Sequence, residues 1–300
     1  MIIKKFEENK LDDLLDLFNI SMPRDKFTKE LLVENVIDDM KENPELCLAT
    51  YEDDKMVGFT MGVIRHRDTE DVGYIKFICT HPDYRRKGIA KELYTEIENG
   101  IRESSVEKIR LIESWPNYYM PGIDPFYTEA VAFFERLGYV KDGDAANLIC
   151  DLESQSFDTS KEEEKVKANG IEIRRAVESD YDAMMEWTDN NFKAWRFEIS
   201  NAFKNDPISL HIALKDGEVI AFSAHESNNP GLGWFGPVGT TEAARGKGVG
   251  GILLKRCLQD MKESGYKEAI IPWVANIPFY MHYINSKVNR VFWRYEKKLK

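Results

Sequence analysis

The 300-residue sequence has few cysteines and lacks any long apolar run. Its four cysteines show no paired spacing, which argues against a disulfide framework or a zinc site. The first residues lack the apolar stretch of a signal peptide, and no segment approaches the length of a membrane span. These absences lead us to expect a cytoplasmic protein that binds neither a metal nor a membrane.

Common catalytic motifs are also missing. The sequence contains no His-Glu-x-x-His and no Gly-x-Ser-x-Gly, which leaves a zincin or an α/β-hydrolase without support. Gly246-Lys247 is followed by Gly248, where a Walker A loop requires Ser or Thr. Neither metalloprotease, serine hydrolase nor P-loop chemistry is therefore expected.

The composition is that of a globular protein, with 43% hydrophobic and 31% charged residues. Three hundred residues supply enough apolar material for two ordinary domains. The net charge of −11 disfavours non-specific binding of nucleic acid and mildly favours cationic substrates.

The most informative stretch runs from residue 235 to residue 254. An apolar run broken by Pro237 and Gly239 predicts a strand with a bulge or a close backbone approach. Apolar residues at helical spacing from Val249 onward predict a helix. Free N–H groups at a helix start, together with the positive end of the helix dipole, bind phosphate. The turn that would form this phosphate receptor is Arg245, Gly246, Lys247, Gly248, Val249 and Gly250.

The same pattern occurs once more, 160 positions earlier, so that Arg85 precedes Arg245 and Gly88 precedes Gly248 by the same interval. Each copy stands between an expected strand and an expected helix. Two copies in register indicate an internal repeat of one domain type. The first copy consists of Arg85, Arg86, Lys87, Gly88, Ile89 and Ala90.

An Arg-x-x-Gly-x-[Gly/Ala] sequence in this position resembles the acyl-CoA-binding motif of the GNAT (GCN5-related N-acetyltransferase) superfamily. The resemblance covers nearly the whole chain as two tandem domains. It implies an α/β fold in which each half has a mixed central sheet flanked by helices. It also implies acetyl-CoA as the acyl donor, with its diphosphate on the amides of the turn. The pantetheine arm would pair with the preceding strand, at Val238 and Thr240 in one copy and at Ile78 and Thr80 in the other.

The expected elements follow one order in both halves. In the first half we expect strands near 1–6, 46–50, 56–59, 72–80, 109–112 and 148–152, with helices near 11–18, 27–40, 89–104 and 130–137. In the second half we expect strands near 171–174, 210–214, 219–225, 234–240, 269–273 and 288–295, with helices near 181–187, 192–203 and 279–284 and after residue 249. The composition of the polar segment 154–169 predicts a solvated linker with a frayed or partly helical acidic stretch. The expected domains are therefore residues 1–153 and 170–300.

Acyl transfer to an amine needs a group that returns a proton to the departing thiol, and a tyrosine hydroxyl can do so. By the resemblance, that tyrosine is Tyr280 in the second half. Phe134 stands at the matching position in the first half and cannot donate a proton. We therefore expect the C-terminal domain to catalyse and the N-terminal domain to be degenerate or to use another residue. A buried ring with a satisfied hydroxyl is the structural alternative for Tyr280.

The general base is less well defined by the sequence. His225 and Glu226 end a strand that should border the acceptor site of the second half, and Glu226 is our candidate base. Glu113 and Asp124 are the candidates in the first half. The aromatic residues Trp115, Tyr118 and Tyr119 either line an acceptor pocket or stiffen a loop.

Two rival interpretations remain. Glycines 246, 248 and 251 match the dinucleotide fingerprint, but Lys91 stands at the counterpart of Gly251 and only about fifty residues follow for further βαβ units. The stronger rival is a non-catalytic acyl-CoA-binding or regulatory protein. For an enzyme, the expected acceptor is the amine of a small molecule or a peptide. The sequence does not indicate an oligomeric state.

Overall fold

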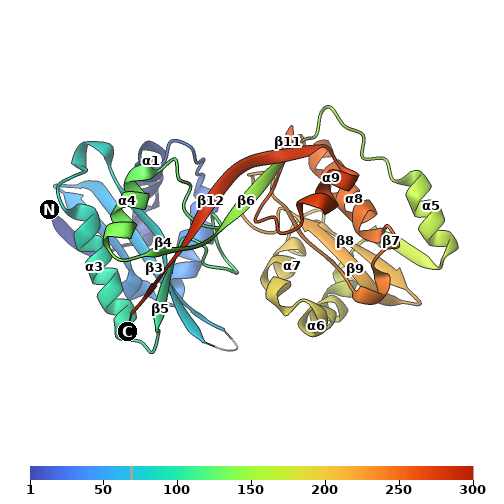
Figure 1. The fold of residues 1–300 in the computed structure, drawn as a ribbon, viewed down its shortest axis with the longest axis horizontal. Coiled ribbons are helices and arrows are strands. Elements are labelled where there is room, and N and C mark those ends of the chain that lie inside the picture. The colour runs from blue at the N-terminus through green and yellow to red at the C-terminus, as the bar shows by residue number, and fades with distance from the viewer. Residues whose placement is uncertain (68–69, 300) are drawn as a thin grey trace. The chain divides into compact units, whose positions relative to one another are not determined.

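The computed structural model describes residues 1–67 and 70–299. The chain divides into two compact units (Figure 1). Unit 1 comprises Met1–Ala145 together with Val291–Lys300, and unit 2 comprises Ala146–Arg290. We expected the boundary in the segment 154–169. In the structure the chain passes from one unit to the other at residues 145–146, within β6 (Val140–Asp151), and at residues 290–291, within β12 (Ser286–Lys298). The last strand of the chain therefore contributes its end to unit 1.

Unit 1 is built on a mixed sheet. Its strands lie in the order β1, β2, β3, β4, β5, β12 and β6. Strand β4 runs parallel to β5, whereas neighbours among β1 to β4 are antiparallel. The elements of this part of the chain are β1 (Ile2–Lys5), α1 (Leu11–Ser21), α2 (Lys29–Leu32), β2 (Cys47–Glu52), β3 (Lys55–His66), β4 (Asp71–Thr80), α3 (Ile89–Arg102), β5 (Lys108–Leu111), α4 (Thr128–Arg136) and β6 (Val140–Asp151).

Helix α3 lies very close to the sheet because glycines face it. A Cβ atom built on Gly58 would lie 2.6 Å from Ile89, and one built on Gly62 would lie 2.7 Å from Ile97. Contacts this short do not occur between real side chains, so only glycine allows the helix to approach this far. These glycines therefore determine the position of α3 and of the turn that precedes it.

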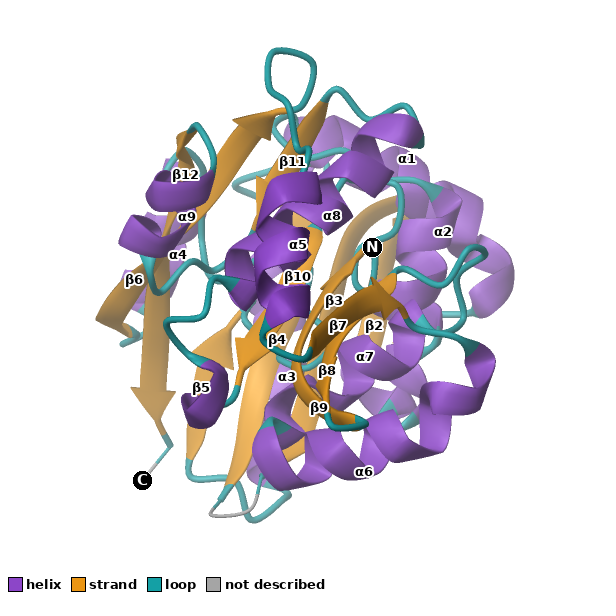
Figure 2. Ribbon diagram, turned by 90° about the vertical axis from the view of Figure 1, so that its right-hand side faces the viewer, coloured by secondary structure: helices purple, strands orange, loops and turns teal. Residues whose placement is uncertain are grey.

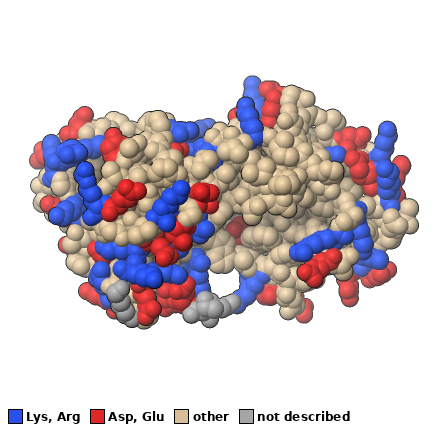
Figure 3. Space-filling model, in the orientation of Figure 1, with Lys and Arg blue, Asp and Glu red and all other residues tan. Residues whose placement is uncertain are grey.

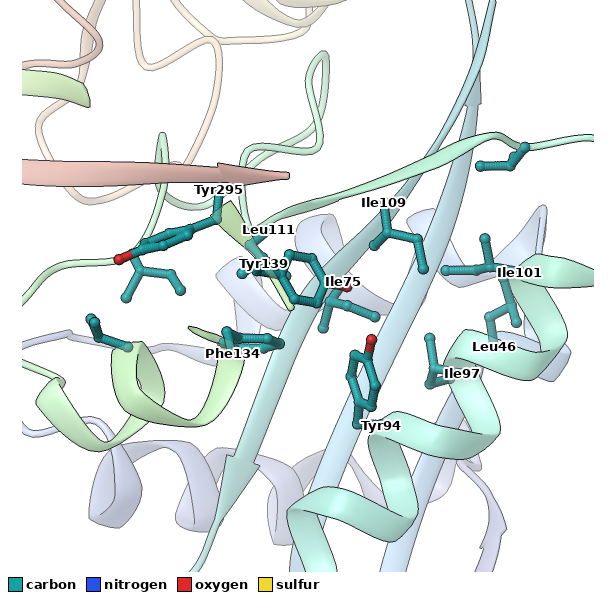
Figure 4. Packing of buried hydrophobic residues seen from close by; sticks show 13 residues of the cluster. Leu46, Ile75, Tyr94, Ile97, Ile101, Ile109, Leu111, Phe134, Tyr139 and Tyr295 are labelled. Atoms are coloured by element: carbon teal, nitrogen blue, oxygen red, sulfur yellow. The ribbon is translucent and has the colours of Figure 1, made fainter. Parts of the chain in front are cut away.

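The core of unit 1 is rich in aromatic rings. Tyr94, Phe134 and Tyr139 pack edge to face with centroids 5.3 to 6.2 Å apart (Figure 4). Tyr295, from the end of β12, lies in the same cluster and is 1% exposed. The core therefore needs a residue from the other end of the chain.

Unit 2 has an antiparallel sheet in the order β10, β9, β8 and β7, and β11 pairs with the end of β6. The remaining elements are α5 (Ser160–Ala168), β7 (Ile171–Arg175), α6 (Tyr181–Asn191), α7 (Arg196–Ala202), β8 (Leu210–Lys215), β9 (Glu218–His225), β10 (Phe235–Thr240), α8 (Val249–Glu263), β11 (Glu268–Ile271), α9 (Ile277–Tyr283) and β12 (Ser286–Lys298).

Helices cover both faces of the unit 2 sheet (Figure 2). Ala213 and Ala221 pack against Val249 of α8, whereas Ile212 and Phe222 pack against Met184 of α6. Successive side chains of a strand point to opposite faces. The alternation therefore assigns α8 to one face and the α6–α7 pair to the other.

The acidic segment before β7 is folded for most of its length. Helix α5 is tied to α8 by the pairs Glu162–Lys255 at 2.9 Å and Glu163–Arg256 at 2.6 Å. Val166 of this helix and Phe157 before it are buried. Instead of a solvated linker, the segment forms a layer on the outer side of α8.

Candidate functional site

The two glycine-rich turns have the same backbone conformation. Gly88 and Gly248 cap α3 and α8 in the left-handed region, with φ of 91° and 80°. Two positions earlier, Arg86 and Gly246 also have positive φ, 65° and 77°. Neither helix has a side-chain cap on its start. The first-turn N–H groups, which have no acceptor within a helix, are thus left for a ligand.

Both turns are open to solvent. Residues 85–88 and 245–248 are exposed, and a Cβ built on Gly246 or Gly248 would meet no atom within 4 Å. Arg85 and Lys87 in one turn and Arg245 and Lys247 in the other supply positive charge. These features together suit an anionic group such as a diphosphate, so the residues present fit the diphosphate of coenzyme A.

The strand before the second turn offers an unpaired edge. Thr241 N donates to Ile220 O at 3.0 Å, one step beyond the pair Thr240–Ala221. Antiparallel pairs alternate between hydrogen-bonded and non-hydrogen-bonded. The peptide groups of Val238 and Thr240 consequently face away from β9. Since β10 is the end strand of its sheet, those groups lie on its outer edge.

The strand before the first turn repeats this register. His81 N donates to Val57 O at 2.9 Å, one step beyond the pair Thr80–Gly58, so the peptide groups of Ile78 and Thr80 face away from β3. On that side β5 pairs with β4 only at residues 73–75. The carbonyl of Thr80 already accepts hydrogen bonds from Ser21 Oγ at 3.3 Å and from Arg85 Nε at 3.4 Å.

Each of these strands has a bulge. In β10 the register shifts between Phe235 and Val238, at Gly236-Pro237, which confirms the bulge predicted from Pro237. In β4 the shift leaves Lys76 as the extra residue opposite β3. A bulge bends its strand and redirects side chains. The two bulges lie at equivalent positions of the repeat, but the residue is Lys76 in one copy and Gly236 in the other.

Tyr280 lies on α9, a short helix whose first turn is capped by the side chain of Asn276. Its half-buried ring packs edge to face on Phe235, with centroids 6.2 Å apart. No residue in the described ranges shares a hydrogen bond with its hydroxyl, and burial raises the pKa of Tyr280 to about 12. The hydroxyl therefore keeps its proton at neutral pH. Phe134, at the matching place in unit 1, is 1% exposed and belongs to the core.

Glu226 has a clear structural contact set. Its carboxylate accepts hydrogen bonds from Gly231 N at 2.6 Å, Trp234 N at 2.9 Å and the Tyr266 hydroxyl at 2.7 Å. These bonds close the loop between β9 and β10. Glu226 itself has a φ of 48°, so the loop also determines its backbone.

His225 points to the opposite side of Glu226, toward α8. Its Nε2 lies 3.4 Å from Asp260 Oδ2, which also lies 2.6 Å from His211 Nε2 and 2.8 Å from Arg175 Nη2. These partners hold the pKa of Asp260 well below its usual range although burial opposes them, and burial lowers the pKa of His211. No spacing in the sequence connects these residues, because they come from β7, β8, β9 and α8.

The candidate bases of unit 1 are paired with arginines. Glu113 is 2% exposed and accepts hydrogen bonds from Arg110 and Arg294. Asp124 is 5% exposed and forms an ion pair with Arg24 at 3.2 Å. Among the aromatic residues proposed for the first half, Tyr119 stacks on Phe27 with centroids 4.5 Å apart.

Lys76 is a buried residue that was not among the candidates predicted from the sequence. Its ammonium group lies 2.7 Å from Asp39 Oδ2 and 3.1 Å from Asn117 Oδ1, and Arg65 Nη2 lies 2.6 Å from the same Asp39 oxygen. Burial lowers the pKa of Lys76 to about 8. A lysine inside the apolar run Tyr74–Cys79 was the available signal.

On the face shown in Figure 3, acidic and basic side chains are interspersed. In the described ranges no group of three or more His, Cys, Asp and Glu side chains is arranged to hold a metal ion. None of the helices in those ranges combines the length and the apolar character needed to cross a bilayer.

Comparison with known families gives one result. The model of the acetyltransferase (GNAT) family matches residues 11–139 and 172–283, one segment in each half. None of the curated proteins matches this sequence.

Solved structures share the two-domain fold. A fungal multi-domain GH3 β-N-acetylglucosaminidase with a GCN5-related glucosamine N-acetyltransferase region is similar at a TM-score of 0.81 and 20% identity, over 99% of this chain. This chain spans 38% of that protein. The tandem GNAT protein from the clavulanic acid biosynthesis pathway has a TM-score of 0.71 at 14% identity, over 99% of this chain and 98% of its own. A GCN5-related N-acetyltransferase from Sphaerobacter thermophilus has a TM-score of 0.70 at 17% identity, over 100% and 96%. At these identities the likeness concerns the fold, and the tandem arrangement expected from the repeat is confirmed.

Proposed function

Because the chain belongs to the acetyltransferase (GNAT) family, we propose that it transfers the acetyl group of acetyl-CoA to a primary amine and that unit 2 carries out the transfer. One observation carries the choice of unit 2. A Cβ built on Gly250 would lie 3.3 Å from Thr240 Oγ1 and 3.4 Å from the ring of Phe279. The start of α8, the end of β10 and the helix that bears Tyr280 therefore meet at one point.

The residues at that point have separable roles. Bound acetyl-CoA supplies an activated thioester. The amides at residues 246–250 bind its diphosphate, and the outer peptide groups of Val238 and Thr240 orient its arm along β10. Tyr280 holds a proton at Oη that can pass to the departing sulfur when the amine forms its bond to the acetyl carbon. As the N–C bond forms and the C–S bond breaks, the proton that the amine nitrogen loses restores the Tyr280 hydroxyl, so charge and atoms balance.

Electrostatics also favours unit 2. The first turn of α3 contains Glu92, whose carboxylate lies 3.8 Å from the Cβ position of Gly88, whereas the first turn of α8 has no acidic residue. A carboxylate at a helix start competes with a phosphate for the same positive end of the dipole. We therefore expect the diphosphate to bind more tightly at α8 than at α3.

The experiment follows thiol release from acetyl-CoA in the presence of several amines. The panel includes a polyamine, a peptide and an amino sugar, the last because one structure of the same fold belongs to a glucosamine N-acetyltransferase region. Tyr280→Phe should lower turnover about 10² to 10³-fold with little change in coenzyme A affinity. Tyr283→Phe, on the same helix, is the matched control and should keep its turnover. Equal turnover of the two variants would remove Tyr280 from the mechanism.

A non-catalytic role is the second candidate, and Phe134 favours it for unit 1. Unit 1 retains the glycine-capped helix start and the strand edge, but a phenylalanine fills the place of the proton donor. Calorimetry should then count two coenzyme A sites. A variant whose turn before α8 is disrupted should lose only the tighter of the two. If no amine is acetylated while both sites fill, the binder is the better description of the whole chain.

Glu226 as a proton acceptor stays a prediction. Glu226→Gln keeps a hydrogen-bonding group of the same size in the loop but cannot accept a proton. If Glu226 is the base, the variant loses turnover and the acidic limb of its pH profile, in addition to the stability lost when its amide NH2 faces a backbone N–H donor. A loss of stability with an unchanged profile would instead assign Glu226 to holding the loop.

A further inference from the structure

The sheet of unit 1 is completed by a strand from the far end of the chain. Residues Glu296, Lys297 and Lys298 of β12 pair antiparallel with Arg110, Ile109 and Lys108 of β5. In the sheet order β12 stands between β5 and β6. Residues 1–145 alone therefore leave a place between β5 and β6 that needs a strand.

Side chains of β12 fill that place on both faces. Phe292 is fully buried. Tyr295 is 1% exposed and lies in the cluster with Phe134 and Tyr139 (Figure 4). The Tyr295 hydroxyl donates to Glu135 Oε1 at 2.8 Å. A segment without aromatic residues at these two positions would leave a void in the core.

Charges along β12 match charges in unit 1. Arg294 donates to Glu113, Glu296 accepts from Arg110 at 2.9 Å, and Lys297 donates to Glu98 at 2.7 Å. Arg102 of α3 also donates to the carbonyl of Leu299 at 2.7 Å. Complementary pairs of this kind fix register and select a partner more than they add affinity.

The exchange is reciprocal. The end of β6, residues 148–151, pairs antiparallel with residues 268–271 of β11 in unit 2. Each unit thus uses a strand that the other half of the sequence encodes. Exchange of one equivalent element between two equivalent partners is the arrangement of a strand-swapped dimer.

We infer that the two halves of this chain, residues 1–153 and 154–300, are specific binding partners that recognise each other as separate polypeptides. The segment Val291–Lys298 is the ligand, and the place between β5 and β6 of unit 1 is its binding site. The covalent link through residues 153 and 154 is not required for this recognition. The inference is independent of the proposed acetyl transfer.

A cut in the intact chain tests it. Glu153 and Ser154 are exposed and lie outside β12, so a protease recognition sequence inserted between them leaves the contacts of β12 with unit 1 in place. After cleavage, light scattering should show one species of the uncut mass, and the two fragments should separate only in denaturant. When the denaturant is removed, the mixed fragments should regain the circular dichroism spectrum of the uncut protein. Release of two folded, monomeric halves in buffer would overturn the inference.

Charge reversal tests the specificity of the strand. Glu113→Arg in the first half or Arg294→Glu in the second should weaken association of the cut halves about tenfold or more, and combining them should restore it. The pair Glu98→Lys and Lys297→Glu repeats the test at less buried positions, in case Glu113→Arg does not fold. Lys287→Glu, an exposed residue on β12 within unit 2, is the control and should bind as the parent does. If the combined reversals bind no better than the single ones at both sites, the strand is not recognised through these charges and the inference fails.

Discussion

Arg294 donates two hydrogen bonds to the carboxylate of Glu113, which lies 181 positions earlier in the chain. Arg110 donates to the same carboxylate. Glu113 is 2% exposed, so its two arginine partners account for its charge in the core. A residue considered as a catalytic base thus holds the last strand of the protein in the first unit.

Substitutions in the turn before α8 should weaken the binding of coenzyme A more than they lower the stability of the fold. Gly248→Ala places a Cβ at a φ of 80° and narrows the approach to the first-turn amides, so coenzyme A affinity should fall about tenfold. Gly265→Ala, at the other end of the same helix with a φ of 92°, imposes the same backbone strain. Calorimetry should find its affinity unchanged, and equal losses in both variants would contradict a ligand role for the turn.

The second glycine of α8 should control the position of Tyr280. A Cβ on Gly251 would lie 2.1 Å from the ring of Tyr283, so Gly251→Ala must displace α9. We expect a fall in turnover of about tenfold or more, with a smaller change in coenzyme A affinity. Gly265→Ala, beyond the other end of α8, is the control, because a Cβ there would meet no atom within 4 Å. Steady-state kinetics of both variants would show the difference.

Asp39 should be essential for the stability of unit 1. Asp39→Ala leaves Lys76 and Arg65 buried without their shared carboxylate, and removal of one partner of a buried ion pair costs about 3–5 kcal/mol. The neighbouring Asp38 pairs with Lys41 on the surface, and Asp38→Ala should cost less than about 1 kcal/mol. Urea unfolding of the two variants measures the difference, and similar midpoints would refute the role of Asp39.

The stability of unit 2 should decrease as the pH falls below about 6.5. Burial lowers the pKa of His211 in the folded chain, so the unfolded chain binds a proton first and the free energy of unfolding drops from that pH downward until the lowered pKa is reached. His211→Gln keeps a donor for Asp260 without a titrating group and should flatten the slope between pH 7 and 5. His66→Gln, at a side chain 77% exposed, should leave the slope as in the parent. An unchanged slope in His211→Gln would exclude this histidine as its source.

Much of the architecture could be read from the sequence because its signals are local. Periodic apolar residues and turn residues located the strands and helices. The strand register puts the peptide groups of Val238 and Thr240 on the outer edge of β10, and their contact with a ligand stays a prediction. The repeat was visible because Gly248 and Gly88 each need a positive φ at the same place. Arg86 has a positive φ, as Gly246 does at the equivalent position. The two turns therefore share their backbone conformation although these residues differ.

Other features depend on residues that are distant in the sequence. The partners of Glu226, the cluster around Asp260 and the buried pair of Lys76 and Asp39 bring together charges that no spacing connects. A charged residue in a strand or helix has the same local pattern whether it faces solvent or a buried partner. Only the packed structure distinguishes these two cases.

The sequence by itself determined that the chain contains two copies of one domain type, because a glycine at a helix start and alternating apolar residues act within a few positions of each other. Only the tertiary structure decided which strand completes which sheet. Strand pairing joins backbone groups that carry no sequence label, and here the burial of Phe292 and Tyr295 and the pairing of Arg294 with Glu113 select the place of the last strand.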